Sequence, residues 1–157
     1  MKPFEKKKQQ EQVIKSLTIS RYTFLRYFTT IVFFLSLYWF ISSFLANRDL
    51  DLLIPIIVGI SQILVNSEMY NAIQFRNDGR LIKSYYILLL DIILLVITLI
   101  IAGNNYKKIF PYLTSKNFAL IFLSLLIVLV VLCFYRVYRI KNMTDKTYKK
   151  IEEYKNK

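Results

Sequence analysis

Four long apolar stretches, separated by short basic or polar segments, constrain this chain more than any other feature. Residues 27–47 and 117–135 contain no charged side chain at all, and 52–75 and 84–106 each contain a single charged side chain, an acid. A hydrocarbon core about 30 Å thick is crossed by roughly 20 helical residues. Each stretch is therefore long enough to be a transmembrane helix.

The four stretches predict an all-α protein, an integral membrane bundle of four transmembrane helices. At 157 residues the chain leaves no room for a separate soluble domain, so we expect residues 1–157 to form a single membrane domain. The predicted spans are 27–47, 52–75, 84–104 and 117–138, and the basic tails are 1–26 and 139–157.

Both tails carry apolar residues at roughly helical spacing. In the N-terminal tail this pattern indicates either an amphipathic helix on the inner leaflet or a frayed, solvated segment. In the C-terminal tail, Tyr148 and Ile151 lie three residues apart, which is enough for a weakly amphipathic helix.

The basic residues predict the orientation of the spans. The two tails and the middle connection lie on one side of the predicted bundle. Together with Arg136, near the end of the last span on that side, they hold 18 of the 22 Lys and Arg, and the other two connections hold 4. Because Lys and Arg concentrate on the cytoplasmic side of membrane proteins, we expect both termini in the cytoplasm. A multi-pass protein of the plasma membrane is the predicted setting.

Composition removes several classes of function. The chain has no histidine and one cysteine, so it has no internal disulfide, no His-based metal site and no His-dependent catalytic arrangement. Its net charge of +12 is concentrated at the ends of the apolar stretches, where it suits a membrane surface better than nucleic acid. With no phosphate-binding glycine loop either, we expect no enzymatic activity, no cofactor and no bound metal.

Aromatic and basic residues alternate at the predicted cytoplasmic ends of the first and last spans. Tyr rings favour the headgroup layer, and Arg side chains extend toward phosphate while their stems stay in apolar surroundings. The pattern predicts a belt at the membrane interface that meets anionic headgroups. Its residues are Arg21, Tyr22, Arg26, Tyr27, Tyr135, Arg136, Tyr138 and Arg139.

Two acids inside apolar spans are the strongest candidates for a mechanism, because charges within a bilayer are costly and usually functional. Counted from the predicted ends of their spans, Glu68 and Asp91 lie at the same depth. As a pair they can share a proton, bind a cation or meet an arginine, and Ser61 and Asn71 extend a polar stripe along the second span. The alternative is that this span ends near Ser67, which leaves Glu68 in the interface and pairs Asp91 with an arginine.

Other aromatic residues have simpler interpretations. Trp39, in the body of the first span, is expected to pack between helices. Four residues of the connection 103–116 are expected at headgroup level: Tyr106, Phe110, Pro111 and Tyr112.

Three short patterns stand out in this layout: Arg21-Tyr22 followed by Arg26-Tyr27-Phe28, then Leu37-Tyr38-Trp39, and Thr144-Asp145-Lys146. With them the chain resembles a group of small four-span proteins of Gram-positive bacteria. Members are often labelled "PTS cellobiose transporter subunit IIA" or are uncharacterised, and some are similar to bacteriocin self-immunity proteins. A phosphotransferase subunit carries its phosphate on a histidine, and this chain has none, so phosphoryl transfer is not expected.

The resemblance, the small size and the lack of catalytic groups favour a protective role against a bacteriocin or another membrane-active toxin. The partner is then a toxin peptide or its membrane target, and residues 106–116 are the expected outward contact. One alternative is a small transporter or channel component that uses Glu68 and Asp91, as a homo-oligomer because four helices enclose little volume. Another is a membrane assembly factor whose basic tails bind a protein partner.

Overall fold

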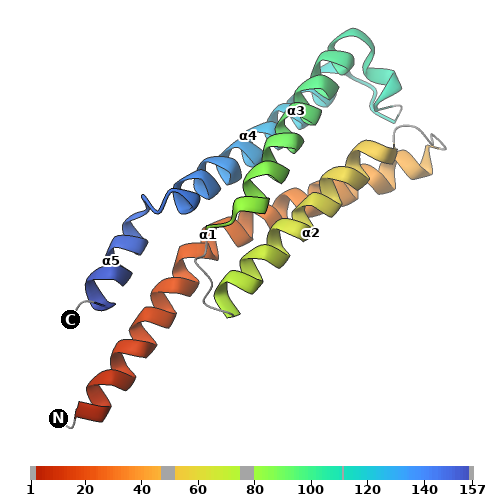
Figure 1. Cartoon of the computed structure of the whole chain (residues 1–157). Coiled ribbons are helices and arrows are strands. Elements are labelled where there is room, and N and C mark those ends of the chain that lie inside the picture. The colour runs from red at the N-terminus through yellow and green to blue at the C-terminus, as the bar shows by residue number, and fades with distance from the viewer. Residues whose placement is uncertain (1–2, 47–51, 75–79, 111, 156–157) are drawn as a thin grey trace.

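The computed structural model describes residues 3–46, 52–74, 80–110 and 112–155, and this part of the chain is almost entirely helical (Figure 1). Within it, four helices are long and apolar enough to cross a membrane, and no strand is present, which confirms the predicted all-α membrane bundle. The elements are α1 (Pro3–Leu45), α2 (Leu53–Gln74), α3 (Ile82–Asn105), the 3₁₀ turn η2 (Tyr106–Lys108), α4 (Lys116–Lys141) and α5 (Lys146–Lys155).

Buried residues recur along each spanning helix at alternating steps of three and four. This alternation averages 3.5 residues, the repeat that keeps one face of each helix on the axis of a bundle. In α3 the buried positions are 84, 88, 91, 95, 98 and 102, and α4 follows the same rule from 119 to 140. In α1 they include Tyr22, Leu25, Thr29, Val32, Ser36, Trp39 and Ser43.

Consecutive helices run antiparallel and form two hairpins, α1–α2 and α3–α4, which pack together through α1 with α4 and α2 with α3. Both termini lie at one end of the bundle, which we call the terminal end, and the α3–α4 connection lies at the other, the loop end (Figure 1). The short helix α5 packs against α1 beyond the terminal end of the bundle.

Close approach of α1 and α2 fixes the register of the first hairpin. Thr29 Oγ1 donates to Asn66 Oδ1 over 3.1 Å, and a Cβ on Gly59 would come within 3.2 Å of Ser36 Oγ. The absence of a side chain at Gly59 therefore lets the two backbones approach. These two contacts place residue 29 opposite 66 and residue 36 opposite 59.

At its N-terminal end α1 extends well beyond the predicted first span. The helix runs without interruption for 43 residues, about 65 Å at 1.5 Å per residue, roughly twice the thickness of a hydrocarbon core. The predicted tail helix therefore exists, but it continues the axis of the first span and does not turn into the plane of the leaflet. The other helix ends fall within three residues of the predicted span ends.

The bend between α4 and α5 positions the C-terminal tail. Met143 has a φ of 54°, and the Met143 and Thr144 N–H groups donate to the Ile140 and Arg139 carbonyls. This is the Schellman pattern that ends helices, with methionine at the position where glycine is usual. The chain then bends and continues away from the bundle, so that α5 lies alongside the N-terminal part of α1 (Figure 1). This helix is the one that the spacing of Tyr148 and Ile151 predicted.

Candidate functional site

Asp91 is a buried carboxylate near the middle of α3. It is 2% exposed and lies about 14 Å from the first residue of the helix. Two side chains of α2 donate to its Oδ2: the Ser61 hydroxyl at 2.5 Å and the Gln62 amide nitrogen at 2.9 Å. We call Ser61, Gln62 and Asp91 the Asp91 cluster.

The Asp91 cluster contains one acid and two neutral partners. Among the described residues, no Lys or Arg forms a salt bridge with Asp91. The Gln62 amide is fully buried, and its Oε1 has no hydrogen-bond partner within the described structure. A carboxyl group with neutral donors and a spare acceptor, deep in an apolar bundle, is a site that can exchange a proton or hold a small cation.

Glu68 lies on α2, as Ser61 and Gln62 do, but its carboxylate has a different role. Its carboxylate accepts hydrogen bonds from the backbone N–H of Lys83 at 3.1 Å, and from the N–H and hydroxyl of Ser84. These N–H groups belong to the first turn of α3, where helix geometry supplies no carbonyl partner and the helix dipole favours a negative charge. Glu68 therefore caps α3 from the neighbouring helix.

The predicted pairing of Glu68 with Asp91 is wrong. Asp91 lies opposite Ser61, whereas Glu68 lies opposite Ser84, so the two acids are separated by seven residues, about 10 Å along the bundle. Depth was counted from the end of each predicted span, but α2 continues past the level at which α3 begins. Two parts of the predicted alternative are also wrong, because α2 continues beyond Ser67 and neutral side chains, not an arginine, bind Asp91. An interfacial position for Glu68 stays a prediction.

The predicted polar stripe on the second span is correct at Ser61 and wrong at Asn71, whose side chain is exposed. The inward polar residues are Gln62, which is buried, and Asn66, which accepts the hydroxyl of Thr29. The three–four spacing of the α2 core, 58, 62, 65, 69 and 72, would have selected position 62 from the sequence.

Two members of the predicted interface belt, Arg21 and Tyr22, are buried at 5% and 2% exposure. Arg21 forms a bidentate pair with Asp145, with Nε 3.0 Å from Oδ2 and Nη2 2.9 Å from Oδ1. Nη2 also donates to the Ile140 carbonyl, at 3.1 Å. For Arg21, the predicted contact with headgroups is therefore replaced by an internal salt bridge.

The Arg21–Asp145 pair fastens the C-terminal helix to α1. Asp145 precedes α5, and its Oδ2 accepts the backbone N–H of Tyr148 at 3.2 Å, as an N-cap residue does. The Tyr148 ring centre lies 5.2 Å from the guanidinium carbon of Arg21, within range of a cation–π contact. One carboxylate thus ends the turn, caps α5 and neutralises Arg21.

Other belt residues lie on the surface. The side chains of Arg26, Tyr27, Tyr135 and Tyr138 are exposed, while those of Arg136 and Arg139 are half-buried. Arg136 donates to the Arg21 carbonyl, and the guanidinium of Arg139 lies 6.0 Å from the ring centre of Tyr135. Contact of the exposed members with anionic headgroups stays a prediction.

An aromatic cluster closes the loop end. Phe110 is fully buried and stacks on Trp39 at 5.0 Å between ring centres, with Phe122 set edge-on to both rings. Trp39 packs between helices as predicted. Phe110 contacts the bundle and does not extend outward, its position at headgroup level stays a prediction, and Pro111 lies outside the described residues. Tyr106 is half-buried, and burial raises the pKa of the Tyr112 phenol to about 12.

Comparison with protein families, with curated proteins and with solved structures finds no match for this chain. The resemblance to small four-span proteins of Gram-positive bacteria therefore stays a prediction from short sequence patterns. The functional argument rests on the contacts of the described residues.

Three features of these contacts bear on function. The Asp91 cluster offers a polar site inside the bundle, and the Arg21–Asp145 pair fixes a helical extension at the terminal end. At the loop end, Phe110 anchors a connection whose exposed side chains include Lys107, Lys108 and Lys116. The first feature is suited to ion or proton chemistry, and the last is suited to binding a partner.

Proposed function

We propose that this chain is a non-enzymatic, multi-pass protein of the plasma membrane that protects the cell against a bacteriocin or another membrane-active toxin. Both termini lie in the cytoplasm in this proposal. The orientation is supported by the charge distribution, because the tails, the α2–α3 connection and the helix ends next to them hold 18 of the 22 Lys and Arg. The loop end then faces outward.

One observation carries the proposal: the α3–α4 connection is folded against the bundle. Ile109 and Phe110 are buried, and the Tyr106 hydroxyl donates to the Thr114 carbonyl at 3.4 Å. Lys107 and Lys108 are thereby held in place on the surface. A surface that is ordered before binding loses less conformational entropy when a partner binds, which favours a recognition role for this face.

Protection through this face needs no chemistry. The chain would bind the toxin, or cover the membrane protein that the toxin attacks, with the basic side chains Lys107, Lys108 and Lys116 oriented toward the partner. Basic groups at an exposed rim raise the rate of encounter with an acidic surface and select against basic ones. The preferred partner is accordingly acidic on the face that it presents.

A sensitivity assay in living cells tests this function. A sensitive strain that expresses the chain should survive higher concentrations of the toxin, and Lys107→Glu with Lys108→Glu should abolish this protection. Lys149→Glu with Lys150→Glu, an equal charge change at exposed positions of α5, is the matched control and should protect fully. If expression of the natural chain left the sensitivity of the strain to the toxin unchanged, the proposal would be wrong.

The Asp91 cluster favours a second candidate, a small carrier driven by protons or cations. A buried acid with neutral partners can change its occupancy during transport, whereas Glu68 is engaged in capping α3. In vesicles, Asp91→Asn should abolish pH- or cation-dependent flux. Glu68→Gln should reduce stability while some flux remains, and equal loss of flux in both variants would contradict this candidate.

A further inference from the structure

A groove runs between α1 and α2 on the outside of the bundle, separate from the loop-end surface and from the Asp91 cluster. It has a volume of about 940 Å³, at the upper end of the range of about 300–1,000 Å³ that is usual for small-molecule sites. Its lining includes Thr23, Arg26 and Tyr27 from α1 and Asn66, Ser67 and Tyr70 from α2.

Small side chains make the groove. Ser67 and the two threonines line it, and the Thr23 and Thr30 hydroxyls donate to the carbonyls of Ile19 and Arg26 on their own helix. The hydroxyl hydrogens of the two threonines are therefore bonded within their own helix, and most of the groove surface is apolar. Ile63, 54% exposed at the deeper end, continues this apolar wall toward the middle of the bundle.

The register of the helices gives the depth of the groove. Because residue 29 lies opposite 66, Arg26 lies opposite Met69, next to the residue that caps the first turn of α3. Arg26 is thus level with the start of a spanning helix, where headgroups lie. Thr30 is about one turn deeper than Arg26, and Ile63 is nearly two turns deeper, at the level of hydrocarbon.

The mouth of the groove is basic and aromatic. Arg26 is exposed and, within the described residues, has no salt-bridge partner. Tyr27 and Tyr70 line the same groove at 68% and 63% exposure, and none of the described residues that line the groove is acidic. An exposed arginine that shares a groove with two exposed phenol rings, at headgroup depth, matches the phosphate of a lipid.

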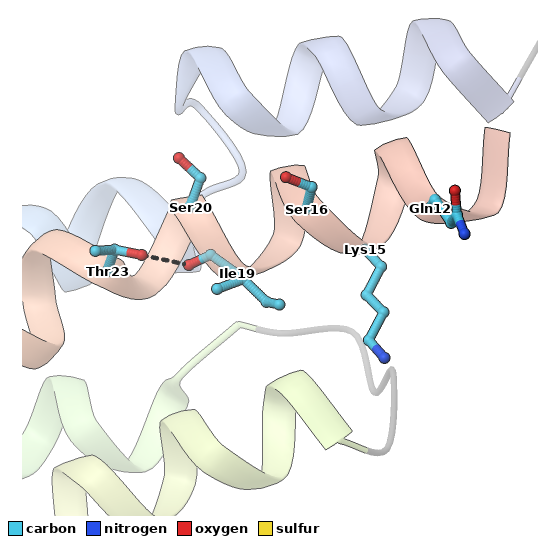
Figure 2. Close-up of a pocket in the computed structure, with 6 residues that line it drawn as sticks. All are labelled: Gln12, Lys15, Ser16, Ile19, Ser20 and Thr23. Carbon is cyan, nitrogen blue, oxygen red and sulfur yellow. Dashed lines mark hydrogen bonds between the residues drawn. The ribbon is translucent and has the colours of Figure 1, made fainter. Parts of the chain in front are cut away.

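A shallower depression on α1 extends the groove toward the N-terminus, since the two share Ile19 and Thr23. Figure 2 shows its residues, with Lys15 extending away from Ser16 and Ser20. The spacing 15, 19, 26 and 30 keeps Lys15 on the face of α1 that carries Arg26. Lys15 therefore adds positive charge beyond the headgroup end of the groove.

We propose that the α1–α2 groove binds one anionic phospholipid, with its phosphate at Arg26 and one acyl chain along Thr30 and Ile63. The combination of a basic mouth with an apolar wall at hydrocarbon depth selects an amphiphile over a soluble anion, which would leave the deeper wall exposed. This inference requires insertion in a bilayer and does not depend on the protective function proposed above.

Native mass spectrometry of the whole chain tests the proposal, after detergent extraction and addition of phosphatidylglycerol or phosphatidylcholine. The natural chain should retain one phosphatidylglycerol, roughly fivefold more often than phosphatidylcholine, the factor expected from one basic residue near an anionic surface. Arg26→Gln should remove this preference and Arg26→Lys should keep it. Ser67→Phe, which fills the groove, should reduce retention of both lipids.

Lys83→Gln is the matched control, because Lys83 is an exposed cation near the same level on α3 and does not line the groove. It should leave the preference unchanged. Equal retention of the two lipids by the natural chain, or equal loss in Arg26→Gln and Lys83→Gln, would overturn the proposal. A dimer that Ser67→Phe disrupts, without retained lipid, would assign the groove to a second copy of the chain and also overturn it.

Discussion

Asp145 and Asp91 are both buried carboxylates, yet the protein surrounds them in opposite ways. At the terminal end of the bundle, Asp145 accepts hydrogen bonds from the Arg21 guanidinium group and from the backbone N–H of Tyr148, and the Tyr148 ring lies against the same guanidinium group. Asp91, near the middle of a spanning helix, faces a hydroxyl and an amide. The first arrangement compensates a full charge, and the second offers only dipoles.

This difference indicates a structural role for Asp145 and a role in proton or cation exchange for Asp91. A bidentate arginine pair with further hydrogen bonds holds one geometry, and removing either partner strands a buried charge. An acid that has only neutral donors can exchange a proton or a cation without breaking an ion pair. We therefore expect substitutions at the Arg21–Asp145 pair to change stability most, and substitutions at Asp91 to change it least.

The largest effect is expected for Arg21→Met, which leaves Asp145 buried without its cation. Breaking a buried pair in this way costs about 3–5 kcal/mol. Because α5 packs against α1 outside the four-helix bundle, the chain relieves this cost by releasing α5 from α1. Hydrogen–deuterium exchange should accordingly show loss of protection across residues 146–155.

Arg26→Met is the control for this prediction, since Arg26 is exposed, and it should leave the exchange of α5 unchanged. The double variant Arg21→Met with Asp145→Leu should recover part of the protection. If α5 stays equally protected in Arg21→Met, the salt bridge does not hold it.

For a third acid, Glu68, we expect a loss of stability between those of the other two. Glu68→Ala removes the acceptor for two N–H groups and one hydroxyl at the start of α3, which should cost about 1–2 kcal/mol. Thermal unfolding in detergent micelles should show a lower midpoint, and the first turn of α3 should exchange faster. Glu152→Ala, at an exposed position of α5, should show neither change.

A smaller effect, of opposite sign, is expected at the bend that brings Asp145 to Arg21. Met143 has a left-handed backbone conformation, which costs an L-residue about 1–2 kcal/mol, while glycine gains chain entropy on unfolding. Met143→Gly should therefore stabilise the docked α5 by about 0.5–1 kcal/mol and slow its hydrogen exchange. Asn142→Gly, one residue earlier at a φ of −85°, should give no such gain.

The sequence predicted the spans because apolar length is a property of each helix separately. The inward position of Trp39, an aromatic residue in the body of a span, and that of Ser61, on a polar stripe, could likewise be predicted from one helix at a time. The register between α2 and α3 could not be predicted in this way, since it depends on where one helix ends relative to the start of the next. Glu68 was for that reason assigned to Asp91 and not to the first turn of α3.

Contacts between residues far apart in the sequence could not be predicted either. The sequence around Arg21 is aromatic and basic, as at a membrane interface. The burial of Arg21 is explained only by its partner Asp145, 124 positions away. Phe110 likewise sits in a polar connection, and its position follows from Trp39, on another helix. A signal was present in Thr144-Asp145-Lys146, because an aspartate just before a helical segment is a common N-cap.

The sharpest test of the comparison places the same isosteric change at both acids. In Asp91→Asn the new amide oxygen accepts from Ser61 and Gln62, and the new amide nitrogen can donate to Gln62 Oε1, which lacks a donor. Stability in micelles should therefore change by less than about 1 kcal/mol. Asp145→Asn leaves Arg21 buried beside a neutral group and should release α5, which hydrogen exchange would detect. If Asp91→Asn destabilised the bundle as strongly as Asp145→Asn, Asp91 would have to carry a charge balanced by a bound cation.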